Sequence, residues 1–196
     1  MSFCIVVARY NENVEWTKQF SNVIIYNKGI PLEGEYNEIF LNNVGRESHT
    51  YYKHIYDNYE NLSDYTIFLQ GHPFDHSPNI ISNIKKYINN TELNIDFEFL
   101  SERILSCNLS GCRYHPGLPL KTTYEKIFNI KKEDMNWIFG AGAHFIVSKK
   151  NILQKPKDFY LNIVKILENS KNLVRAHAPD PIEAWVIERL HPLILN

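Results

Sequence analysis

The sequence has few cysteines, no long apolar run and almost no net charge, and each shortage excludes a class of protein. Its three cysteines, Cys4, Cys107 and Cys112, form neither an even disulfide framework nor a paired Cys-x-x-Cys zinc motif, so we expect free thiols. The first apolar run, residues 5–8, is too short for a signal peptide or a membrane span, which predicts a cytoplasmic protein. A formal net charge of -1 gives no indication of a nucleic-acid partner.

Several catalytic signatures are also missing. The chain has no Walker phosphate loop, no GxGxxG run, no HExxH pair and no GxSxG elbow, so common hydrolases and dinucleotide enzymes gain little support. A chain of 196 residues with 44% hydrophobic and 22% charged residues is ordinary globular composition. We therefore expect one domain over residues 1–196. Its 12 tyrosines and 11 phenylalanines supply a large core and rings that stack on bases or sugars.

Hydrophobic periodicity predicts an α/β fold. Strands are predicted at residues 3–8, 23–26, 64–70 and 97–100, with an interrupted strand region at 137–147. Helices are predicted at 15–20, from 45 onward, at 78–88, around 160–167 and after 180–181, and loops at 27–43 and 107–120. Strands that alternate with helices favour right-handed crossovers and a mainly parallel or mixed sheet flanked by helices.

Two polar clusters follow predicted strands, at the end of a parallel sheet where ligands of α/β proteins bind. The first cluster comprises Arg9, Tyr10, Asn11 and Glu12, and the second begins at Gln70. The second also holds His72, Asp75 and His76, whose nitrogen and oxygen atoms are suitable ligands for a divalent ion. A simple turn explains the same residues, because Pro73 and Asp75 are common turn formers.

Three further segments carry candidate chemistry. Arg46 stands at the predicted start of a helix, where backbone N–H groups and its guanidinium favour an anion, although a solvated pair with Glu47 is an equal alternative. The small residues at 139–143 suit either close approach of a ligand or tight packing. Lysines between residues 149 and 157 are expected on a solvated edge.

The last helix holds three candidate general bases, Asp180, Glu183 and Glu188, of which the two glutamates are the main candidates. Asp180, Pro181 and Glu183 also have the spacing of a capping-box arrangement, so Glu183 has a structural alternative. The two glutamates are five residues apart, about 140° around a helix, and do not share a face.

Five segments resemble a family whose function is unknown. They are residues 6–12 (VVARYNE), 43–50 (NVGRESHT), 68–76 (FLQGHPFDH), 139–148 (FGAGAHFIVS) and 188–189 (ER). That family is similar to GT-A glycosyltransferases, including minimal domains encoded by large DNA viruses. Residues 140–148, Pro156, residues 159–160 and residues 179–180 also resemble core-2 branching N-acetylglucosaminyltransferases, in which a glutamate base follows Pro-Asp.

The resemblance implies a GT-A-like fold and a transfer of sugar from a nucleoside diphosphate sugar, expected to be a UDP-sugar, to a hydroxyl acceptor. Residues 10–12 would hold the nucleoside, with Tyr10 against the base, and Arg9 and Arg46 would face the diphosphate. The usual Asp-x-Asp metal motif is replaced here by Gln70, Gly71 and His72. Mn²⁺ or Mg²⁺ would then depend on Asp75 and the histidines, and a metal-independent enzyme is the alternative.

Glu183 or Glu188 would be the base of an inverting reaction, and Trp137 and Tyr160 would wall the acceptor side. Two other classes of function stay open at this point. One is a metal-dependent hydrolase that uses His72, Asp75 and His76. The other is a non-catalytic module that binds a nucleotide or a carbohydrate.

Overall fold

A six-stranded mixed sheet forms the centre of the computed structural model, which describes residues 1–169, 172–175 and 178–196, and side chains at 1–169 and 182–196. The strand order is β3-β2-β1-β4-β10-β5. The first four are parallel, and β10 runs antiparallel to both of its neighbours. Their bounds are β1 Phe3–Arg9, β2 Val23–Asn27, β3 Glu38–Phe40, β4 Tyr65–Gln70, β5 Phe97–Phe99 and β10 Phe145–Ser148. The predicted α/β class is confirmed.

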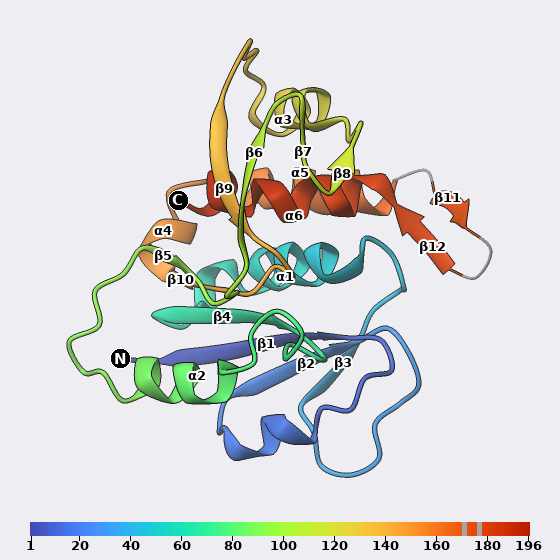
Figure 1. Ribbon diagram of the computed structural model, residues 1–196. Coiled ribbons are helices and arrows are strands. Elements are labelled where there is room, and N and C mark those ends of the chain that lie inside the picture. The colour runs from blue at the N-terminus through green and yellow to red at the C-terminus, as the bar shows by residue number, and fades with distance from the viewer. Residues whose placement is uncertain (170–171, 176–177) are drawn as a thin grey trace.

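Helices cover both faces of this sheet, because β1 and β4 carry apolar side chains on both sides. Cys4 and Val6 face one core, with α1, α5 and α6, whereas Ile5 and Val7 face another, with α2. Figure 1 shows α1 above the sheet, α5 and α6 beyond it, and α2 below. The helices are α1 Arg46–Asp57, α2 Ile80–Ile88, α3 Leu120–Phe128, α4 Lys149–Ile152, α5 Lys157–Glu168 and α6 Ile182–Leu195, with 3-10 helices η1 Glu15–Gln19 and η2 Tyr59–Asn61.

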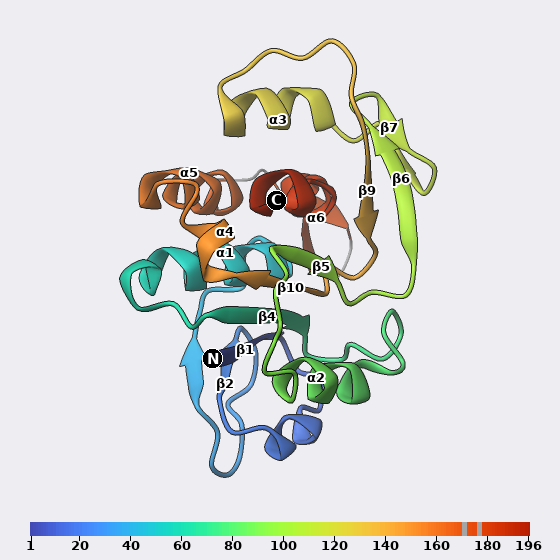
Figure 2. The same ribbon diagram turned by 90° about the vertical axis from the view of Figure 1, so that its left-hand side faces the viewer.

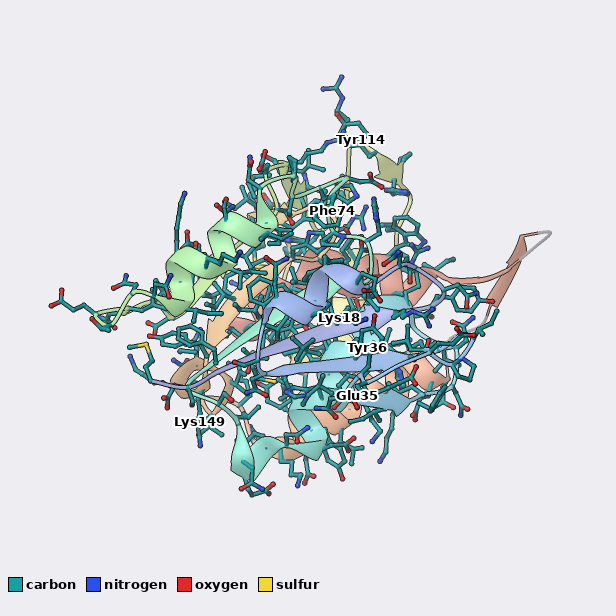
Figure 3. All side chains as sticks on the ribbon, turned by 90° about the horizontal axis from the view of Figure 1, so that it is seen from below. Lys18, Glu35, Tyr36, Phe74, Tyr114 and Lys149 are labelled. Atoms are coloured by element: carbon teal, nitrogen blue, oxygen red, sulfur yellow. The ribbon has the colours of Figure 1, made fainter. Side chains whose placement is uncertain are left out.

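The loop after β2 is attached to η1 on the lower side of the sheet. Lys18 of η1 lies over the ring of Tyr36, with Nζ 4.9 Å from the ring centroid (Figure 3). The Tyr36 hydroxyl also donates to the Glu15 carboxylate. The prediction that residues 27–43 form only a loop is wrong, since they contain β3. That strand is three residues long and half exposed at the sheet edge, so it has too little alternation to be recognised.

A second sheet, in the order β8-β7-β6-β9, packs against α6 and is antiparallel throughout (Figure 2). Its strands are β6 Ile104–Asn108, β7 Gly111–Cys112, β8 His115–Pro116 and β9 Asn136–Gly140. The predicted loop at 107–120 therefore contains short strands, which is a correction. The predicted strand region at 137–147 splits between the two sheets, because Gly142, with φ +86°, and Ala143, with φ +55°, turn the backbone between β9 and β10.

The chain ends in a hairpin and the last helix. The hairpin pairs β11 Asn172–Arg175 with β12 Ala178–Pro181. The predicted terminal helix is confirmed as α6, which begins directly after Pro181. Among the described helices, none combines the length and the apolar character needed to cross a membrane.

Candidate functional site

The candidate site lies at the carboxyl ends of β1 and β4. These parallel neighbours mark a switch point, because the chain continues from β1 outward to β2 and β3 and returns to β4 on the other side. A cavity of about 420 Å³ opens there. It is lined by residues after both strands and at the start of α1, namely Ala8, Arg9, Tyr10, Glu12, Lys28, Asn43, Arg46, Glu47, Gln70, His72 and Asp75. We call it the first chamber. The structure thus brings the two predicted polar clusters together.

Arg9 organises the loops around this chamber. Its guanidinium is buried and donates through Nη1 to Asn27 Oδ1 at 2.8 Å and to the carbonyl of Ile30 at 2.7 Å. Its Nε donates to the carbonyl of Glu12 at 2.9 Å. These bonds connect the ends of β1 and β2, so Arg9 has a positioning role beside its place in the chamber wall.

The other residues of the first cluster, Tyr10, Asn11 and Glu12, have different roles. Glu12 Oε2 accepts hydrogen bonds from the backbone N–H groups of Tyr10 and Asn11, at 2.6 and 3.2 Å, and Asn11 Oδ1 accepts one from Ile30 N–H. A Cβ at Gly71 would lie 2.8 Å from Glu12 Oε2, so glycine there lets the carboxylate approach β4. Tyr10 is 52% exposed. Its ring is therefore the member of this cluster that is most available for stacking on a ligand.

Lys28, which the sequence analysis missed, supports the start of α1. Its Nζ donates to the carbonyls of Val44 and Arg46. Burial lowers the pKa of Lys28 to about 7. Both Gly45 and Arg46 have left-handed backbone, with φ +59° and +50°, which the bonds from Lys28 help to hold. Its place directly after β2, at the same sheet edge as Tyr10, was the available signal.

A second chamber of about 430 Å³ adjoins the first, and both share Arg46, Glu47 and Gln70. Its other walls come from four parts of the chain: the segment between β4 and α2, the small sheet with its flanking residues, the β9–β10 turn and α6. They comprise His76, Arg103, Leu105, Tyr114, His115, Phe139, Ala141, Gly142, Trp185, Glu188 and Arg189. The Arg46 guanidinium lies 4.7 Å from the centre of the Trp185 ring, which connects α1 to α6. One cleft therefore extends from the β1 and β4 ends to α6.

Glu188 is a buried carboxylate in the wall of the second chamber. It is 8% exposed, and its Oε1 accepts a hydrogen bond from Gly142 N–H, while Oε2 lies 3.1 Å from Arg189 Nη1. Burial and the charge of Glu47 raise the pKa of Glu188 to about 7, against the attraction of Arg189. A carboxylate with this pKa is suited to accept a proton near neutral pH.

Glu183 lies elsewhere on α6. It lines neither chamber and is half-buried in the first helical turn. Its buried Oε2 has no hydrogen-bond partner among the described residues. The capping role predicted for the Asp180 side chain lies outside the described side chains. The structure thus separates the two candidate bases and places Glu188 in the cleft.

The predicted metal ligands divide between the chambers. His72 Nε2 and Asp75 Oδ1 are 3.6 Å apart, and both line the first chamber, whereas His76 lines the second. Within the described part of the chain, no group of three or more His, Cys, Asp or Glu residues is arranged to hold a metal ion. These donors do not fit a three-ligand cation site, although one carboxylate beside substrate phosphates is a mode that Mg²⁺ uses.

Two expectations about the acceptor side are corrected. Tyr160 is fully buried and donates to the carbonyl of Ile152, and Trp137 is buried and donates to the carbonyl of Arg189. Both rings therefore belong to the hydrophobic core, whereas Trp185 and Tyr114 line the second chamber. The small residues at 139–143 do permit a close approach, but by a protein side chain, since a Cβ at Gly142 would lie 2.6 Å from His76 Cδ2.

Comparison with known proteins places this arrangement in a family. No curated protein and no solved structure matches the chain. A family model described as "Protein of unknown function (DUF3431)" matches residues 5–102. The matched part includes every residue that lines the first chamber. With half of its length matched, the chain belongs to the DUF3431 family of proteins of unknown function.

Proposed function

We propose that the cleft binds a nucleoside diphosphate sugar, most suitably a UDP-sugar, and transfers the sugar to a hydroxyl acceptor in the manner of a GT-A-like glycosyltransferase. The observation that carries this proposal is Glu188. This buried carboxylate lies in the second chamber, and its pKa is raised to about 7. The second chamber adjoins the first, which lies at the switch point of the parallel sheet.

The first chamber suits the nucleoside diphosphate. The exposed Tyr10 ring offers a surface for the base, and Glu12 and Asn11 shape the loop beneath it. The basic side chains of Lys28 and Arg46 both line the first chamber at the start of α1, and the amino end of a helix favours anions. A diphosphate placed there would favour the charged form of Lys28.

The second chamber suits the reaction. Glu188 would accept the proton of the acceptor hydroxyl as its oxygen attacks the anomeric carbon. The bond from that carbon to the diphosphate then breaks, and the nucleoside diphosphate leaves with the electron pair. Arg46 borders both chambers and would stabilise the charge that develops on the leaving group. With Glu188 on the face of the anomeric carbon opposite the diphosphate, the hydroxyl would attack from that face and invert the configuration at this carbon. This mechanism has no step through a metal ion.

Ligand-dependent melting tests the donor site. UDP at 100 times its Kd should add about 2.7 kcal/mol to the stability of the folded protein. AMP and NAD should add less. No shift with any nucleoside diphosphate at millimolar concentration would contradict the donor site.

Release of UDP from UDP-sugars, in the presence of mixed hydroxyl acceptors, tests the transfer itself. Binding of UDP without release, for every donor and acceptor offered, would instead support the non-catalytic nucleotide-binding module. Release of inorganic phosphate that depends on added metal would support the hydrolase.

A further inference from the structure

Two cysteines face each other across the hairpin of β6 and β7. Cys107 pairs directly with Cys112 in the antiparallel register, and both are free thiols. Directly opposed residues of such a pair have Cα atoms about 4.5–5.5 Å apart. A disulfide needs Cα atoms about 4.4–6.8 Å apart, so this pair can be bridged without moving the backbone far.

Arg189 makes the two thiols chemically different. Its Nε lies 3.1 Å from Cys112 Sγ. Burial raises the pKa of the Cys112 thiol, but the hydrogen bond and charge of Arg189 outweigh it, so that pKa lies below its ordinary value. Burial and the neighbouring Cys112 raise the pKa of Cys107 to about 12. The hairpin therefore combines a thiolate-forming cysteine with a protonated partner.

The two side chains are buried, with Cys107 4% and Cys112 9% exposed, but they border a pocket that opens outside the cleft. Cys107 and Cys112 both line a surface pocket of about 400 Å³, together with Ser106, Asn108, Ser110, Gly111, Arg113, Pro116 and Asn136. Cys4 offers a contrast within the same chain. It lies in β1, between two neighbouring strands of the main sheet, and burial raises its pKa to about 11.

We propose that Cys107 and Cys112 form a reversible oxidation site, at which a small peroxide converts the two thiols into an intrachain disulfide. The Cys112 thiolate attacks one peroxide oxygen, the O–O bond breaks, and hydroxide leaves to give a sulfenic acid. Cys107 sulfur then attacks the Cys112 sulfur, the S–O bond breaks, and the hydroxide takes the Cys107 proton. The two cysteines lose two electrons and hydrogen peroxide becomes two waters. A small dithiol reverses the change by thiol–disulfide exchange.

The test uses the whole folded protein, hydrogen peroxide and mass spectrometry. After oxidation, the protein is unfolded in iodoacetamide, and the number of alkylated cysteines is counted. We expect three alkylated cysteines to fall to one, a peptide that links Cys107 to Cys112, and recovery of all three after dithiothreitol. Loss of all three thiols at one rate, or a linkage between different chains, would overturn the proposal.

Three variants separate the roles of the cysteines. Cys4→Ser is the matched control, and its two remaining thiols should be lost together. Cys107→Ser should stop at a Cys112 sulfenic acid that dimedone traps, whereas Cys112→Ser should leave Cys107 unreacted. In native wild-type protein, Cys112 should react at least about tenfold faster than Cys4, since each pH unit below its pKa reduces a thiolate about tenfold. Equal rates for the two would contradict the role of Arg189.

Discussion

The Glu188 carboxylate accepts a hydrogen bond of 2.9 Å from the backbone N–H of Gly142. This bond joins α6 to the turn between β9 and β10, two segments that are 46 residues apart in sequence. It orients the carboxylate that we propose as the base, while Arg189 holds its other oxygen. The orientation of the Glu188 carboxylate therefore depends on the backbone conformation of this turn.

Replacement of Glu188 by glutamine removes the proposed base and keeps most of its shape. We expect Glu188→Gln to lower sugar transfer by about 10²–10⁴-fold with the fold intact. UDP should still bind. Glu183→Gln is the matched control on the same helix, and it should stay active because Glu183 lines neither chamber. An inactive but folded Glu183→Gln, beside an active Glu188→Gln, would transfer the role to Glu183.

The pH profile gives a second test of the same carboxylate. Because its pKa is raised to about 7, Glu188 becomes a competent base only as pH rises through that value. We expect kcat for transfer, measured with saturating donor whose diphosphate keeps Lys28 charged, to increase up to about pH 7 and then level off. The Glu188→Gln variant should lose this dependence. A rate that is flat from pH 5 to 8 in the wild type would contradict the assignment.

The lowered pKa of Lys28 predicts how the free energy of unfolding varies with pH. Its folded pKa of about 7 lies below the ordinary value of 10.5, so the unfolded chain binds more protons between these values. This contribution is fully present above 10.5 and is lost as pH falls through 7. From pH 7 to 9, wild-type stability should rise relative to Lys28→Met by up to about 1.4 kcal/mol per pH unit. Urea unfolding at several pH values measures the difference, and a constant difference would refute a buried, neutralised amine.

A comparison of alanine substitutions at Gly142 and Gly117 distinguishes the cost of a strained backbone from the cost of a steric clash. The φ values of these glycines are +86° and +83°, but a Cβ would meet the His76 ring at Gly142, whereas at Gly117 it would meet no atom of the described residues within 4 Å. We expect Gly142→Ala to destabilise by about 1–3 kcal/mol more than Gly117→Ala, as overpacked sites do. Gly142→Ala should also reduce transfer, because it would displace the backbone N–H that donates a hydrogen bond to Glu188. Equal unfolding free energies of the two variants would show that the His76 ring moves aside without cost.

Chelation decides whether a cation assists the diphosphate. If Asp75 binds Mn²⁺ or Mg²⁺ against the phosphates, EDTA should weaken UDP binding, and Asp75→Asn should weaken it equally. Calorimetric titration of UDP, with and without EDTA, measures both effects. The same UDP affinity under both conditions would leave Lys28 and Arg46 to hold the phosphates and would support the metal-independent alternative.

Local patterns were sufficient to predict five of the six strands of the main sheet and the helices α1, α2, α5 and α6. Alternate residues of β1 enter two cores, and such a strand appears in the sequence as a continuous apolar run. The polar residues after β1 and β4 follow those runs directly, so their meeting at one sheet edge could be predicted. β3, β7 and β8 could not be predicted, because strands of two or three residues carry almost no periodicity.

The tertiary environment of individual side chains was beyond sequence reasoning. Arg9 was expected to face a diphosphate, yet three of its hydrogen bonds go to neighbouring loops. The choice between Glu183 and Glu188 depended on which side of α6 the small sheet covers. Lys28 became important because the carbonyls of Val44 and Arg46 turn toward it, which a residue pattern does not show.

The two chambers are encoded in order along the chain. Every residue that lines the first chamber lies between residues 8 and 75. Apart from the three shared residues and His76, the second chamber is built from residues 103–189. A chimera that exchanges the polypeptide after residue 102 between two family members would thus keep the first chamber and replace most of the wall of the second. If the proposed transfer is correct, this modular arrangement would let acceptor preference diverge by recombination while donor recognition is inherited unchanged.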